Sequence, residues 1–128
     1  IDFFVQRADA SDREALKAAI DGIQRAAKAD DLTQFSKMDF EFHMALIKGS
    51  KNSFLYGAMT EYQVMFKHYL SEISRLSDKP LTTLAQEHLT LYNSITSKKP
   101  KEAKQFLFSD NTFYYLTYFS KWLERLKE

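Results

Sequence analysis

Apolar residues recur every three or four positions through most of the chain, which is the spacing that places side chains on one face of an α-helix. The repeat predicts helices near residues 12–28, 32–48, 53–76, 82–97 and 100–126. The opening segment IDFFVQRA resembles the second half of a further helix that begins upstream. With three Gly and two Pro in the whole chain, the pattern predicts an all-α protein, an antiparallel bundle of about six helices.

Residues that favour helix ends stand at the limits of these segments. The expected N-terminal caps are Ser11 with Glu14, Asp30 or Asp31, Asn52, Thr83 with Gln86, and Pro100 at a first helical position. Gly49 is expected to end the helix near 32–48 by adopting a left-handed conformation.

Four polar residues lie on or beside the apolar faces of three different predicted helices: Asp39, His43, His88 and Asp110. With Phe35 as the origin, Asp39 lies about 40° and His43 about 80° around the helix axis. Their spacing of four residues places the two side chains next to each other on one face. His88 lies near the middle of its apolar stripe, and Asp110 shares a face with apolar neighbours. Each of the four is therefore a candidate for the interior.

Two acids and two imidazoles directed into one core are expected to converge, because a buried carboxylate without a partner is costly. A divalent cation would satisfy all four, and this donor set suits zinc, nickel, manganese or iron. A hydrogen-bonded polar core without metal would satisfy them as well, and the residues alone leave both possibilities open. His68, about 140° around its helix from Leu55, is expected to lie outside this group.

Composition limits the classes of function. The chain of 128 residues is the length of one domain, and its formal charge of +1 offers no basic field for nucleic acid or an anionic membrane. It has no run of roughly 18 apolar residues, as a membrane-spanning helix requires. Absence of Cys excludes disulfides and thiolate metal sites, which is compatible with a reducing compartment.

Three motifs in order along the chain resemble the C-terminal effector domain of FadR-type GntR regulators, often called FCD. They are D-x-x-F-H from Asp39 to His43, the loop from Gly49 to Asn52, and E-H at Glu87 and His88. The resemblance covers nearly the whole chain. It implies an FCD-like domain over residues 1–128 that is truncated at its N-terminus, with a winged helix-turn-helix DNA-binding domain upstream.

The resemblance also implies a metal site. In metal-binding members of the family, one aspartate and three histidines hold the ion, and Asp39, His43 and His88 match three of those positions. Asp110 occupies the position of the remaining histidine, which is a departure from the family pattern. Zinc, nickel or manganese is the expected cofactor, because carboxylate and imidazole ligands both suit these ions.

The function that the resemblance implies is the sensing of a small organic acid whose carboxylate completes the metal's coordination. Lys67, Tyr92 and Tyr114 are the expected ligand-binding side chains, because Lys and Tyr can donate hydrogen bonds to an anionic oxygen. The expected protein is a cytoplasmic bacterial homodimer that contacts DNA through the upstream domain and has no membrane contact.

An alternative from another class is a metal-dependent helical-bundle enzyme, with a nonhaem iron or a hydrolytic zinc site. Against it, the chain has no H-E-x-x-H or E-x-x-H pair, and no spare acid beside the ligands is an evident general base. Glu87, which precedes His88, is expected to point about 100° away around the helix. A structural helical module with a satisfied polar core is the third possibility.

Overall fold

A computed structural model of the chain describes residues 1–97, 99, 101 and 102. This part of the chain is all-α and contains no strand, as predicted. Its helices are α1 (Asp2–Arg7), α2 (Ala10–Lys28), α3 (Leu32–Gly49), α4 (Ser53–Glu61), α5 (Gln63–Leu76) and α6 (Leu81–Thr96). The predicted helix near 100–126, Asp110 and Tyr114 lie outside the described residues, except for its first positions.

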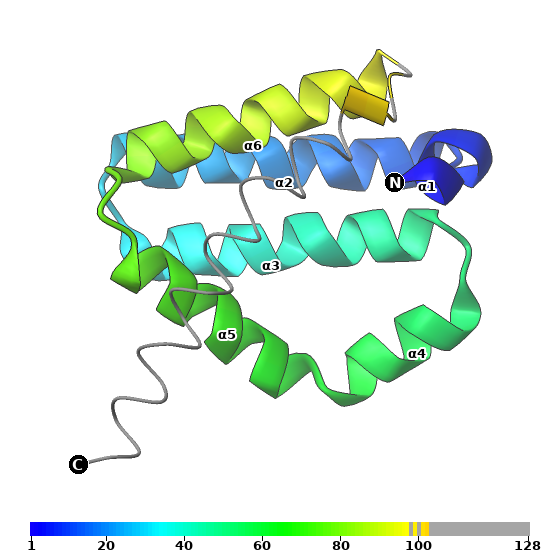
Figure 1. Ribbon diagram of the computed structural model, residues 1–128, viewed down its shortest axis with the longest axis horizontal. Helices are drawn as coiled ribbons and strands as arrows, with labels where there is room; N and C mark the ends of the chain where they lie inside the picture. The colour runs from blue at the N-terminus through cyan, green and yellow to red at the C-terminus, as the bar shows by residue number, and fades with distance from the viewer. Residues whose placement is uncertain (98, 100, 103–128) are drawn as a thin grey trace.

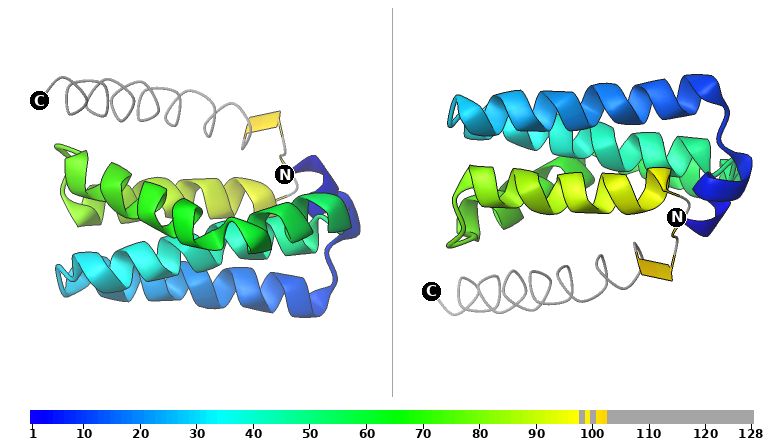
Figure 2. Two further views of the ribbon diagram at one scale, coloured as in Figure 1. Left: turned by 90° about the horizontal axis from the view of Figure 1, so that it is seen from below. Right: turned by 90° about the horizontal axis from the view of Figure 1, so that it is seen from above.

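Helices α2, α3 and α6 form the main body of the bundle, and α6 runs in the direction of α3 and opposite to α2 (Figures 1 and 2). The helical spacing over 12–28 predicts an apolar stripe on α2. All its members are buried and pack against buried residues of α3 and α6: Leu16, Ala19, Ile20, Ile23 and Ala27. The core members from these helices include Leu16, Ile20, Ile23, Phe35, Phe42, Leu46, Leu84, Leu91 and Ile95. The Gln24 amide donates a hydrogen bond of 2.8 Å to the Ala85 carbonyl, which fixes α6 against α2.

The start of α2 differs from the prediction. The helix begins two residues earlier, and its cap is Asp9 rather than Ser11. Asp9 accepts a hydrogen bond from the Asp12 backbone N–H while the Asp12 carboxylate accepts one from the Asp9 N–H, both 2.9 Å long. Two reciprocal carboxylate bonds satisfy both backbone donors, so the S-x-x-E sequence that starts two residues later is simply part of the helix.

The end of α3 also differs, because Gly49 does not adopt a left-handed conformation. The positive φ of 58° belongs to Lys51, whose ammonium lies 2.7 Å from the buried Asp12 carboxylate and 3.3 Å from that of Asp9. Gly49 is needed for space instead, since a Cβ there would lie 2.3 Å from the Phe4 ring. The close approach of α1 to α3 therefore explains this glycine.

The single helix predicted over 53–76 is two helices, α4 and α5, that meet at Tyr62. Two residues before the break, the Thr60 hydroxyl donates a hydrogen bond of 2.8 Å to the Tyr56 carbonyl. Bonds of this kind from Thr to the carbonyl four residues earlier bend helices. Figure 1 shows the result, in which α5 turns back toward the bundle after α4 has left it. The predicted cap at Asn52 is confirmed.

The break changes which residues of this segment are buried. The spacing that predicts the helix over 53–76 places Leu55, Met59 and Tyr62 on one apolar face, but α4 has no buried residue, and Leu55 and Tyr62 are exposed. Only its later part reaches the core, where Leu70 of α5 is buried.

The start of α6 is the last difference. Pro80 is its N-cap, and the Thr83 and Leu84 N–H groups both donate to the Pro80 carbonyl, so the expected capping box of Thr83 with Gln86 does not form. At the end of the α2–α3 connection, Asp31 is the N-cap of α3. It is one of the two residues expected there.

No helix within the described residues is both long enough and apolar enough to cross a membrane.

Candidate metal and effector site

Helices α3 and α6 bring three of the predicted site residues together. The Asp39 Oδ1 atom lies 2.8 Å from His88 Nε2 and 3.2 Å from His43 Nε2. Asp39 and His43 are neighbours because they are four residues apart on α3, whereas His88 is brought to them by the packing of α6. One carboxylate oxygen thus faces two imidazole nitrogens.

The Asp39 carboxylate is held as an anion inside the bundle. Its residue is only 5% exposed. Burial alone would raise the pKa of Asp39, but the charge of His88 and the hydrogen bonds from His43 and His88 outweigh burial and hold the pKa well below its usual range. The same pairing acts in the opposite sense on His88. Burial would lower the pKa of His88, but the charge of Asp39 and the hydrogen bonds to Asp39 and the Leu84 carbonyl raise it.

The surroundings of His88 determine which of its nitrogens carries a proton. Its Nδ1 lies 2.8 Å from the Leu84 carbonyl oxygen, which can only accept, so Nδ1 must carry hydrogen. Its Nε2 lies 2.8 Å from Asp39 Oδ1, which is also an acceptor. A neutral imidazole cannot donate to both. His88 is therefore an imidazolium, or a divalent cation bound by Nε2 and Asp39 would take the place of the Nε2 proton.

Aromatic rings enclose the two histidines. Phe42 contacts both imidazoles edge to face, with ring centroids 5.9 Å from His43 and 5.6 Å from His88. Phe35 lies 5.9 Å from His88, and Phe66 of α5 lies 5.8 Å from His43. This apolar wall restricts water and strengthens the electrostatic attraction between Asp39 and its partners.

The three side chains fit a divalent cation. One donor atom from each of Asp39, His43 and His88 lies within 4.8 Å of the other two. Around a cation with bonds of about 2.0–2.2 Å, donor atoms lie at most about 4.4 Å apart, so little movement is needed. The Leu84 carbonyl already orients His88 from the far side of the ring, as is usual for metal-binding histidines. Three protein donors leave at least one coordination position for another ligand.

The other predicted site residues have different surroundings. The Lys67 ammonium lies 4.7 Å above the Phe40 ring, and the residue is exposed. Tyr92 is half-buried, one turn after His88 on α6, and packs against the core. Both roles in ligand binding remain predictions.

The angles around the helix axes predicted that His68 and Glu87 lie outside the group of donors, and both do lie apart from Asp39, His43 and His88. His68 is exposed on α5. The Glu87 carboxylate forms an ion pair with Lys79 instead of turning toward His88.

Two features of the site were not predicted from the sequence. The Leu84 carbonyl could have been, because a helical carbonyl four residues before a histidine lies within reach of its ring in one of the common side-chain rotamers. Phe66 could not, since its position depends on the turn between α4 and α5.

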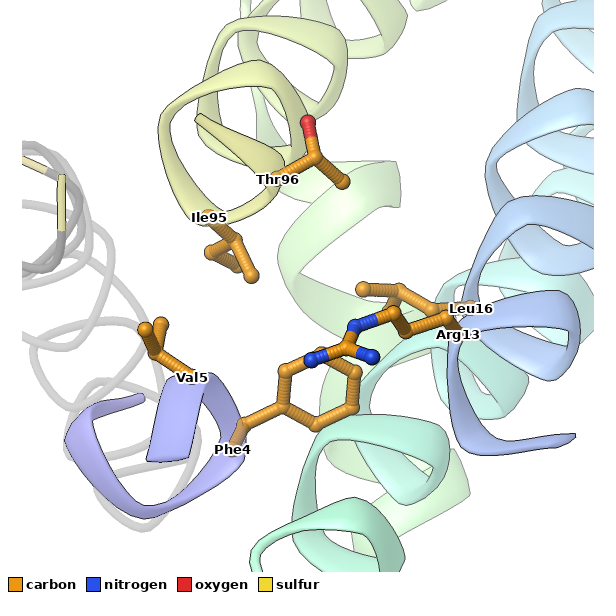
Figure 3. Close-up of a pocket in the computed structure, with 6 residues that line it drawn as sticks. All are labelled: Phe4, Val5, Arg13, Leu16, Ile95 and Thr96. Atoms are coloured by element: carbon orange, nitrogen blue, oxygen red, sulfur yellow. The ribbon is translucent and has the colours of Figure 1, made fainter. Parts of the chain in front are cut away.

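A separate cavity of about 60 Å³ lies between α1, α2 and α6, and Phe4, Val5 and Ile95 point toward it (Figure 3). None of the three donor residues lines it. It has room for about two waters and is far smaller than the roughly 300–1,000 Å³ of a small-molecule pocket. The cavity is therefore smaller than a typical small-molecule site and separate from the three donors.

A family model described as the FCD domain matches residues 2–109, a span that includes Asp39, His43 and His88. The match agrees with the resemblance that the D-x-x-F-H and E-H motifs indicate. No curated protein matches the chain.

Proposed function

Because this chain belongs to the FCD family, the C-terminal domain of FadR-type GntR regulators, we propose that it senses a small organic acid through a bound divalent metal ion. Zinc, nickel or manganese would be held by Asp39, His43 and His88, with Asp110 as the fourth ligand. A winged helix-turn-helix domain encoded upstream would bind DNA. The whole regulator would act as a cytoplasmic homodimer, and its output would change when the acid binds.

The observation that carries the proposal is the position of His88 between two acceptors. The Leu84 carbonyl fixes hydrogen on Nδ1, and Nε2 then faces Asp39 Oδ1 at 2.8 Å. A cation beside Nε2 would be bound by the imidazole lone pair and by the carboxylate together, with His43 Nε2 as the third donor. The proton on His88 would no longer be required.

The chemistry of the expected effector follows from the charge of the site. A metal ion supplies positive charge that an anionic oxygen can bind directly, and the aromatic wall of Phe35, Phe42 and Phe66 limits competing water. Lys67, Tyr92 and Tyr114 would add donors for the remaining oxygens of the acid. A carboxylate with a small polar body fits this combination better than a neutral apolar ligand.

Metal binding is tested first, by elemental analysis of the purified domain after dialysis against nickel or zinc. Wild-type protein should retain about one ion per chain, while His88→Ala and His43→Ala should lose at least tenfold in affinity, because each removes a ligand. His68→Ala is the matched control, since its ring is exposed and outside the donor group. Equal losses in all three variants would contradict the site.

Effector binding is tested next, by the thermal shift of the metal-loaded domain with a panel of small carboxylic acids. An acid at 100 times its Kd should stabilise the domain by about 2.7 kcal/mol. Chelation should abolish the shift, and His88→Ala should abolish it too. If no acid shifts the melting of the loaded domain while a metal-dependent reaction on such a compound is detected, the sensor proposal is wrong and the enzyme alternative stands.

A further inference from the structure

A groove of about 440 Å³ lies between α2 and α3, and we call it the α2–α3 groove. Its volume is within the roughly 300–1,000 Å³ of small-molecule sites, unlike that of the cavity beside α1. Apolar side chains of these two helices form its floor: Ala15, Ala18, Ala19, Met38, Met44 and Ala45. The groove therefore has the size and the apolar lining of a site for a small ligand.

The residues of α2 keep the groove open. Some exposed positions of this helix carry long charged side chains, such as Lys17, whereas the exposed Ala15 and Ala18 beside the groove are alanines. Gly22 makes room for Met38, because a Cβ on Gly22 would lie 2.4 Å from the Met38 Sδ atom. Met38 is thus seated against α2, and this wall of the groove is in place before a ligand binds.

Two side chains of opposite charge line the groove, and both come from α3. Glu41 and Lys48 are exposed, and they are seven residues apart. They therefore lie on the same side of α3, separated by about 10 Å along its axis. Within the described residues, neither side chain has an ion pair or a hydrogen bond. Both charges are available to a ligand.

Tyr56 adds a hydrogen-bond donor at the Lys48 end of the groove. Helix α4 begins just beyond the C-terminal end of α3, where Lys48 is the last residue but one (Figure 1). Tyr56 lies one turn into α4 and lines the groove. An ammonium and a phenol hydroxyl can both donate hydrogen bonds to a carboxylate. The Lys48 end therefore suits an anionic group, and Glu41 suits a cationic one.

We propose that the α2–α3 groove binds an elongated zwitterion with an apolar body, such as an ω-amino acid. Its carboxylate lies against Lys48 and Tyr56, its ammonium lies against Glu41, and its carbon chain covers the alanine and methionine floor. The site goes beyond the proposed function and does not depend on the metal. Glu41 lies about 160° around the axis of α3 from both Asp39 and His43, so the groove is on the opposite side of that helix.

Methyl NMR spectra of the methionines in the full 128-residue chain test the site, because two of the four methionines line the groove. The probe is 8-aminooctanoate, whose extended length is close to the separation of the two charges. It should shift the methyl signals of Met38 and Met44. Met59 and Met65, on α4 and α5, are internal controls that should not move. No shift, or equal shifts in all four, would overturn the proposal.

Probes with a single charge test whether both ends of the groove are used. Octanoate and octylammonium should each bind about threefold more weakly than 8-aminooctanoate, since exposed ion pairs make contributions of this size. Lys48→Gln should remove the preference over octylammonium, and Glu41→Gln the preference over octanoate. Lys28→Gln, at an exposed lysine of α2 outside the groove, should leave all three affinities unchanged. If octanoate binds the wild type as tightly as the zwitterion does, the proposal is wrong.

Ala18→Phe tests the groove without altering either charge, because it places a ring on the floor. It should abolish the methionine shifts, whereas Ala10→Phe, at another exposed alanine of α2, should retain them. If Ala18→Phe changes the mass of the particle while no probe shifts Met38 in the wild type, a protein surface covers the groove and the proposal fails.

His88→Ala separates this inference from the proposed function. It should lose metal and still bind 8-aminooctanoate with the affinity of the wild type. Failure of the probe to bind would leave the sensor proposal intact, and failure of the chain to bind metal would leave the groove intact.

Discussion

The bundle body of α2, α3 and α6 and the pair α4 and α5 have the same kind of sequence but different surroundings. Both carry apolar residues at helical spacing. In α2 every member of the predicted stripe is buried, whereas α4 has no buried residue. A helical period shows which residues share a face. It does not show whether another element of the same chain lies opposite that face.

The largest difference between the two regions should appear when one phenylalanine is truncated in each. Phe42→Ala removes a fully buried ring that also contacts both site imidazoles, and it should lower the free energy of unfolding by about 3–5 kcal/mol. Phe54→Ala in α4 should change it by less than about 0.5 kcal/mol in the separated chain. Urea unfolding of dilute protein measures both. Comparable losses would mean that α4 is buried within the chain.

A smaller effect should appear with pH in the metal-free domain. The pKa of His88 is raised in the folded state, so its contribution to stability is complete below its unfolded value of about 6.5 and is lost as pH rises through the folded pKa. The pKa of Asp39 is lowered in the folded state, so its contribution to stability is present above its unfolded pKa of about 3.9. That contribution is lost only as pH falls through the folded pKa. Stability from the pair should therefore fall on the alkaline side.

Urea unfolding between pH 6 and 9 in the presence of a chelator would measure this decline. His88→Gln should flatten it, because glutamine does not titrate. His68→Gln, at an exposed position of α5, leaves the pair with Asp39 intact and should keep the wild-type slope. A slope that survives in His88→Gln would assign the pH dependence to other groups.

The smallest effect concerns the helix caps. Asp9→Ala removes the cap bond that the Asp9 carboxylate accepts from the Asp12 N–H at the start of α2, and should lower global stability by about 1 kcal/mol. Asn52→Ala removes the single cap bond of α4, from the Leu55 N–H. It should mainly speed hydrogen exchange within α4 and leave the amides of α2 unchanged. Slower exchange in α2 than in α4 in every variant would fit the comparison, and equal acceleration in both helices would contradict it.

The parts of the fold that follow from local rules could be predicted from the sequence. The α2 stripe, the cap at Asn52 and the placement of Asp39 beside His43 all depend on helical geometry within a few residues. The convergence of His88 on that pair was also predicted, because polar groups on apolar faces must satisfy one another. Asp110 lies outside the described residues, so its place in the ligand set remains a prediction.

The predictions that were wrong concern positions determined by contacts between distant residues. Gly49 has the sequence context of a left-handed helix end, but the Phe4 ring of α1 determines it, and Lys51 takes the positive φ instead. The break at Tyr62 contains neither Pro nor Gly. It follows the hydrogen bond from the Thr60 hydroxyl to the Tyr56 carbonyl, and it lets α5 return to α3. Residue spacing alone contains neither contact.

The Leu84 carbonyl has a consequence for how the domain would take up its ion. Because it holds hydrogen on Nδ1 of His88, a metal that binds Nε2 must displace the proton that otherwise bridges to Asp39. Uptake is then an ion exchange in which one proton leaves for each divalent cation that enters, so occupancy depends on the ratio of cation to proton activities. Titration calorimetry in buffers of different ionisation enthalpy would count that proton. At acidic pH such a site would release its metal, and with it any ligand bound through the metal, without any change in the supply of either.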